Sequence, residues 1–101
     1  MANQTNVMTP DDKRRTNNLA VRAALRSLAN TQRVLAGHYR QWAREEAREL
    51  EQMQHRRFAT PGEREEAIEM ATGRRRLYAS EARRLFRDAQ WNINHARIYH
   101  G

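Results

Sequence analysis

The sequence has no cysteine and little glycine or proline, with four Gly and two Pro among 101 residues. The lack of cysteine excludes disulfides, thiolate chemistry and cysteine-based zinc sites. It is typical of a reducing compartment, so we predict a cytoplasmic protein. No apolar run approaches the roughly 18 residues that a membrane span needs, and the N-terminus lacks the basic and apolar regions of a signal peptide. We therefore expect a soluble, unprocessed chain.

Motifs for catalysis are also lacking. Neither Ser27 nor Ser80 lies in a glycine elbow that would present a serine nucleophile, and no glycine-rich loop could hold a phosphate. No histidine follows a carboxylate by three residues, so the Glu-x-x-His pair of carboxylate metal bundles is missing. A chain this short also rarely encloses a deep site. We predict a non-enzymatic protein with no catalytic residue, no metal and no cofactor.

The sequence does contain two helix starts of one design, Thr9-Pro10-Asp11-Asp12 and Thr60-Pro61-Gly62-Glu63. In each, threonine can cap the helix, proline occupies the first helical position, and an acid follows in the first turn. Thr60 and Glu63 also fit a reciprocal capping box. We predict a flexible N-terminus over residues 1–8 and one helical domain over 9–101, with helix 1 at about 10–57, a turn at 58–60 and helix 2 at about 61–98.

Apolar residues recur at spacings of three and four along both predicted helices, the pattern of helices that pack lengthwise. In helix 1, Ala29, Ala36 and Ala43 flank this row at intervals of seven. The row in helix 1 consists of Val21, Leu25, Leu28, Gln32, Leu35, Tyr39, Trp42, Glu46, Leu50 and Met53. The row in helix 2 consists of Ala67, Ala71, Tyr78, Ala82, Leu85, Ala89, Ile93 and Ala96, broadened by Leu77, Phe86 and Trp91.

The short connection predicts an all-α fold, a long antiparallel helical hairpin that resembles a coiled coil. Two helices alone leave much apolar surface in water, so we predict homodimerisation into a helical bundle. The alternative is a three-helix bundle with a break near Asn30. In the hairpin, large residues of the two helices should meet: Trp42 with Leu77 and Tyr78, Leu35 with Leu85, and Leu28 with Trp91. The predicted interaction seam consists of Leu25, Leu28, Leu35, Tyr39, Trp42, Leu77, Tyr78, Leu85, Phe86 and Trp91.

Charge is distributed unevenly along the chain, which has a net charge of +7. Residues 13–44 carry eight cations and no acid, whereas residues 45–69 carry eight Glu against four Arg. Residues 70–101 carry seven Arg against two acids. In a hairpin, the turn end is then acidic and the open end strongly basic. Because no acid interrupts residues 13–44, pairing within that helix cannot neutralise its cations.

This charge favours an anionic partner, nucleic acid first, since arginine binds phosphate in a bidentate manner. The alternative is a protein-interaction module, such as an adaptor, inhibitor or assembly subunit encoded by a phage or plasmid, that binds an acidic protein surface or uses its apolar seam. Binding to a membrane surface through the same cations ranks third, and no membrane span is expected. The predicted binding residues are Arg22, Arg26, Arg33, Arg40, Arg44, Arg74, Arg75, Arg76, Arg83, Arg84 and Arg87.

Overall fold

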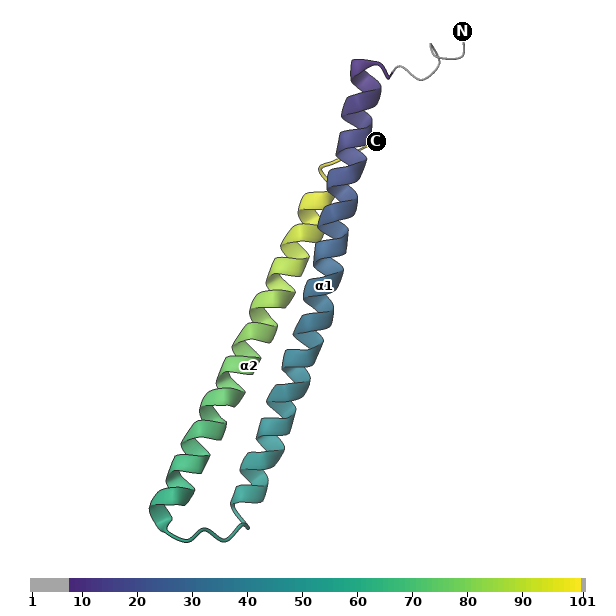
Figure 1. Cartoon of the computed structure of the whole chain (residues 1–101). Helices are drawn as coiled ribbons and strands as arrows, with labels where there is room; N and C mark the ends of the chain where they lie inside the picture. Colours follow the sequence, from purple (N-terminus) through teal and green to yellow (C-terminus); the bar gives the residue numbers. More distant parts are fainter. Residues whose placement is uncertain (1–7, 101) are drawn as a thin grey trace.

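The computed structural model describes residues 8–100, which form two long α-helices and no strand. Helix α1 spans Pro10–Met53 and helix α2 spans Pro61–Ala96. They lie side by side as an antiparallel hairpin about 84 Å long, and α1 extends beyond the end of α2 (Figure 1). The predicted all-helical hairpin is confirmed. Seven of the eight residues of the predicted flexible N-terminus lie outside the described residues.

Both helices begin at the predicted threonine caps. The hydroxyl oxygen of Thr9 accepts a hydrogen bond from the Asp12 backbone N–H at 3.1 Å, and the Asp12 carboxylate accepts one from the Thr9 N–H at 3.3 Å. The reciprocal capping box therefore forms at the first helix, because aspartate reaches back as well as glutamate does. At the second helix, Thr60 accepts from the Glu63 N–H at 3.2 Å, and only this half of the predicted box is present.

Helix α1 is continuous through Asn30, so the predicted three-helix alternative is wrong. Asn30 and Gly37 are weak helix formers, but both are exposed and outside the contact with α2. Thr31 donates its hydroxyl hydrogen to the Ser27 carbonyl within the same helix at 3.1 Å. Residues with low helix propensity are tolerated here because the buried face on either side of them is unbroken.

Helix α1 ends at Met53, four residues before the predicted end at 57. The chain leaves the helix through tighter bonds, in which the N–H groups of Gln54 and His55 donate to carbonyls three residues back. The Arg64 guanidinium then donates to the Gln54 carbonyl at 3.1 Å, which supplies a partner for the end of the helix from across the turn. The connection is therefore longer than expected, because a tertiary contact stabilises an early helix end.

The two helices meet along small residues rather than large ones. Ala29 and Ala36 of α1 and Ala71 and Ala89 of α2 are fully buried, whereas no large side chain in residues 8–100 is. We call this line of contact the alanine seam. It also includes Leu85, which is 5% exposed, and the half-buried Leu25, Tyr39 and Tyr78. The alanines that were expected to flank the row in α1 therefore form its centre.

The prediction that large residues fill the hairpin contact is correct in part. Trp42 packs on Tyr78, with ring centroids 5.8 Å apart, and Leu85 is buried as expected. Leu28 and Leu35 are 48% and 39% exposed, because the helix is rotated so that the residue after each one, Ala29 or Ala36, faces α2 instead. Leu77 and Trp91 are 57% and 61% exposed on α2, so their predicted places in the seam are wrong.

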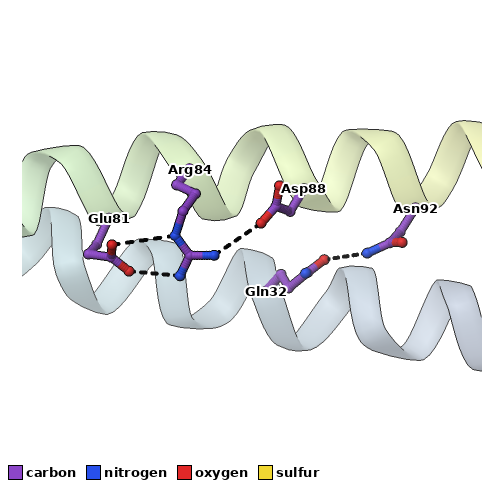
Figure 2. A network of polar contacts seen from close by, with 5 residues as sticks. All are labelled: Gln32, Glu81, Arg84, Asp88 and Asn92. Carbon is purple, nitrogen blue, oxygen red and sulfur yellow. Dashed lines mark hydrogen bonds and ion pairs between the residues drawn. The ribbon is translucent and has the colours of Figure 1, made fainter.

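Two polar contacts fix the register of the hairpin. The Asn92 amide donates to the Gln32 side-chain oxygen at 2.8 Å, and Asn92 is only 5% exposed (Figure 2). Nearer the turn, the Arg74 guanidinium pairs with both carboxylate oxygens of Glu46 at 2.9 and 3.3 Å. Because Gln32 and Asn92 are level, α1 extends roughly 25 Å past the last turn of α2 at the open end.

Candidate nucleic-acid interface

Three arginines form a row along one face of α1. Arg26, Arg33 and Arg40 are spaced by seven residues, which brings each one to the same side of the helix about 10 Å from the next. All three are exposed, and no acid in residues 8–100 forms an ion pair with them. The Arg40 guanidinium lies over the ring of Phe86 in α2, 5.4 Å from its centroid. This contact shows which flank of α2 the arginine row adjoins.

Helix α2 adds arginines beside the same row. A shallow groove of about 300 Å³ lies between the helices, with Arg40 on one bank, Arg83 and Phe86 on the other, and alanines at its floor. A second groove of similar volume continues it along α2 and is lined by Arg75, Arg76 and Arg83. We call this flank of the hairpin the basic edge, defined by Arg26, Arg33, Arg40, Arg75, Arg76 and Arg83.

The two acids of α2 beyond residue 70 are paired away from the basic edge. Beyond residue 70, the only acids are Glu81 and Asp88, and both are held by Arg84 (Figure 2). The Arg84 guanidinium lies 2.8 Å from Glu81 and 3.1 Å from Asp88. The hydrogen bond from Arg84 lowers the pKa of Glu81, and the bond to Glu81 raises the pKa of Arg84. These two acids therefore pair with Arg84, and within residues 8–100 no ion pair forms with an arginine of the basic edge.

The predicted binding arginines thus fall into two groups. Arg74 and Arg84 are each paired with acids of the hairpin, and the hydrogen bond to Glu46 raises the pKa of Arg74. The other predicted arginines form none of the ion pairs seen in residues 8–100. Arg44 and Arg87 are exposed one helical turn from Arg40 and Arg83 and border the basic edge.

Arg22 lies apart from the other predicted arginines, at the open end where α1 extends past α2. Its side chain is half-buried, and its Nε atom is buried without a hydrogen-bond partner in the described part of the chain. Arg22 and Arg26 line a groove of about 510 Å³ together with Leu19 and Ser27. A buried donor without a partner that borders an open groove suits an acceptor from another molecule.

No protein-family model matches this chain, and no curated protein or solved structure is significantly similar to it. Its surface chemistry therefore carries the functional argument. Within residues 8–100, no group of three His, Asp or Glu side chains is placed to hold a metal ion. Neither helix is long and apolar enough to cross a membrane.

Sequence reasoning found the arginines but missed what lies between them. Phe86 was expected in the contact between the helices, yet it is 38% exposed beneath Arg40 on the basic edge. Ala79 and Ala82 form the floor of the groove. The sequence predicts only a packing role for Ala82 and no role for Ala79. The sequence pattern that could have predicted this groove is a small residue beside arginines on a helix, because small side chains leave a groove between flanking guanidinium groups.

Proposed function

We propose that this chain is a non-enzymatic nucleic-acid-binding protein whose basic edge contacts the phosphate backbone. The observation that supports this most is the separation of charge in α2, where both acids beyond residue 70 pair with Arg84 on the flank away from Arg83. Arginines that have no acidic partner, arranged along a groove, favour an extended anion over a small one.

Backbone contact fits the basic edge better than base stacking does. Arg40 covers Phe86, and the exposed Trp91 is stacked on His95, with ring centroids 4.7 Å apart. Trp91 also follows Arg84 by seven residues, which places it on the flank away from Phe86. Free aromatic platforms are the usual means of holding single strands, so a duplex held through its phosphates suits this edge better.

The test is the salt dependence of binding to a 20-base-pair DNA duplex. If about five phosphates are neutralised, the logarithm of affinity should fall against the logarithm of salt with a slope near −4 to −5, with little dependence on sequence. The triple substitution Arg26→Gln, Arg33→Gln, Arg40→Gln should reduce the slope by about 2 to 3 units, because it removes three phosphate contacts.

The matched control removes the same charge from the turn end through Arg48→Gln, Arg56→Gln, Arg57→Gln. These residues are also exposed, so an effect of net charge alone would weaken binding equally in both variants. Equal loss in the two triple variants contradicts a role for the basic edge. If wild type binds neither the DNA duplex, nor RNA duplex, nor single strands at 50 mM salt, the nucleic-acid proposal fails.

A second function is favoured by a separate observation. Exposed large apolar residues recur along both helices, among them Leu28, Leu35, Leu77 and Trp91, which suits a protein-interaction module. We propose that its first partner is another copy of this chain, which completes a helical bundle. Light scattering of the protein without nucleic acid tests this pairing, since it predicts twice the 12.0 kDa chain mass at micromolar concentration. A measured mass equal to that of one chain would contradict this pairing and would leave the apolar residues to bind an unrelated protein.

A further inference from the structure

Eight of the twelve large apolar residues that are exposed in residues 8–100 form two rows along the hairpin. On α1, the row is Val21, Leu28, Leu35 and Trp42, with exposures of 39 to 48%. The second row follows α2, with Met70, Leu77 and Trp91 on the helix and Ile98 in the turn just after it; their exposures are 57 to 65%, and Arg84 takes the remaining position at the same spacing of seven.

Both rows are turned away from the contact between Arg40 and Phe86. Leu35 and Trp42 follow Arg33 and Arg40 by two residues, which is a rotation of about 200° around α1. Leu77 and Arg84 precede Ala79 and Phe86 by two residues, which is the same rotation around α2. Trp91 follows Arg84 by seven residues and shares its face. Since Arg40 covers Phe86, the rows turned away from these two residues share the other flank. We call it the apolar edge, defined by the eight apolar residues of the two rows.

The charge of the hairpin points to a second copy of the chain as the occupant of the apolar edge. The turn end, residues 45–69, is acidic, and the open end is strongly basic. Two copies in opposite directions bring the turn end of each beside the open end of the other, whereas copies in the same direction bring basic ends together. A closed pair with the same edge on both sides also needs only a two-fold axis.

The spacing of the α1 row suits this opposed arrangement. The positions at intervals of seven are Val21, Leu28, Leu35, Trp42 and Glu49, and Leu35 is their centre. With a two-fold axis at Leu35, Leu28 of each copy meets Trp42 of the other, and Val21 meets Glu49. The overhanging start of α1 then runs beside the partner copy's α1 end and turn. The part of α1 that lacks a neighbour in its own hairpin gains one.

The polar network of Figure 2 also has a role in this arrangement. Counting from the pair of Gln32 and Asn92, Leu35 is level with Ala89, so the Asp88 side chains of two copies approach the axis. Two carboxylates would repel there, but Arg84 pairs with Asp88 in each copy at 3.1 Å. We propose that the apolar edge is the interface of an antiparallel homodimer, with α1 facing α1 and Leu35 near the two-fold axis. This deepens the homodimer proposed above.

The first test measures dimer dissociation by sedimentation, without nucleic acid. The substitutions Leu28→Gln and Leu35→Gln change residues that are already exposed in the hairpin, so helicity should persist. They should raise the dissociation constant at least about 100-fold, because four leucine burials are lost from the pair. The control pair Leu19→Gln and Val34→Gln replaces two other exposed apolar residues of α1, 47% and 63% exposed, outside the α1 row. It should leave the dimer within about 3-fold of wild type.

The second test determines direction, and the absence of native cysteine makes it unambiguous. Val21→Cys and Glu49→Cys chains, mixed and treated with a short bis-maleimide, should cross-link to each other and neither to itself. Leu35→Cys should cross-link to itself. A parallel pair, in which α1 faces α2, would give none of these products.

The outcomes separate the interface from the functions proposed above. A wild-type monomer overturns the homodimer and with it this interface, whereas a dimer that persists in the Leu28→Gln, Leu35→Gln variant overturns the interface alone. Duplex binding by the basic edge is measured separately through the arginine variants, so its failure leaves the mass and cross-linking results unaffected. Equal dissociation of the edge and control variants also overturns the assignment.

Discussion

The two edges of the hairpin are built from the same two helices, and in α1 their side chains alternate within every turn. Arg33 and Leu35 are two residues apart, as are Arg40 and Trp42, yet one of each pair belongs to the basic edge and the other to the row of exposed apolar side chains. Because two residues span about 200° around a helix, one short motif repeated every seven residues builds both edges.

The difference between the edges shows that a seam of small residues leaves large side chains exposed for other contacts. When alanines form the contact between two helices, the helices consume little apolar surface, and the large residues remain for other contacts. In a hairpin held by leucines, those large residues would be buried between its own two helices. The alanine seam therefore allows one flank for charge and another for apolar contact.

Making the apolar edge basic should produce the largest effect. Leu28→Arg with Leu35→Arg places two cations from each copy at the proposed dimer contact, so the dissociation constant of the dimer should rise more than 100-fold, about 2.7 kcal/mol. Duplex binding by the basic edge should persist in the resulting monomer, as checked by titration at 50 mM salt. Loss of duplex binding together with the dimer would show that the two edges do not act separately.

Overfilling the alanine seam should affect both edges together. Ala36 is fully buried, so Ala36→Leu forces the helices apart and should lower the free energy of unfolding by about 1 to 3 kcal/mol. Chemical denaturation followed by circular dichroism measures this change. Ala24→Leu makes the same substitution at an exposed position of α1 and should change stability by less than about 0.5 kcal/mol. Similar effects at the two positions would contradict the seam.

Breaking the register contact should give a smaller loss. Asn92→Leu leaves the half-buried Gln32 amide without its partner, which should cost about 1 kcal/mol in unfolding free energy. The double substitution Asn92→Leu, Gln32→Leu should recover much of that cost, because both polar groups are gone. It should also weaken the register, measured as broader cross-linking between cysteines placed on the two helices. No recovery in the double variant would mean that the pair stabilises the hairpin outright.

The Arg84 network should contribute least, and only above acidic pH. The Arg84 hydrogen bond lowers the pKa of Glu81 below its usual value of 4.5, so the folded chain binds that proton less readily than the unfolded chain. Its stabilisation is therefore complete above about pH 4.5 and is lost as the pH falls through the lowered pKa. Glu81→Gln should unfold earlier than wild type at pH 7, and the difference between the two should be smaller at pH 3, in thermal melts. A constant difference at both pH values would contradict this role.

Local signals in the sequence are enough to predict the two helices and the hairpin. The caps Thr9 and Thr60, each followed by proline, mark where the helices start, because local hydrogen bonds and a fixed φ angle need no distant partner. The arginine row was also readable, since seven-residue spacing fixes a shared face of any helix. The early end of α1 was not, because the Gln54 carbonyl finds its partner across the turn, from Arg64.

Which row of α1 meets α2 depends on how the two helices pack, and no local signal predicts it. The row through Leu28 and Leu35 and the row through Ala29 and Ala36 are one residue apart, and both include Leu25 and Tyr39. Periodicity identifies residues that share a face, but it cannot choose between two overlapping faces. That choice depends on where the second helix crosses and how closely its own alanines allow it to approach. The helices pack through the row of Ala29 and Ala36, so the row of Leu28 and Leu35 remains exposed.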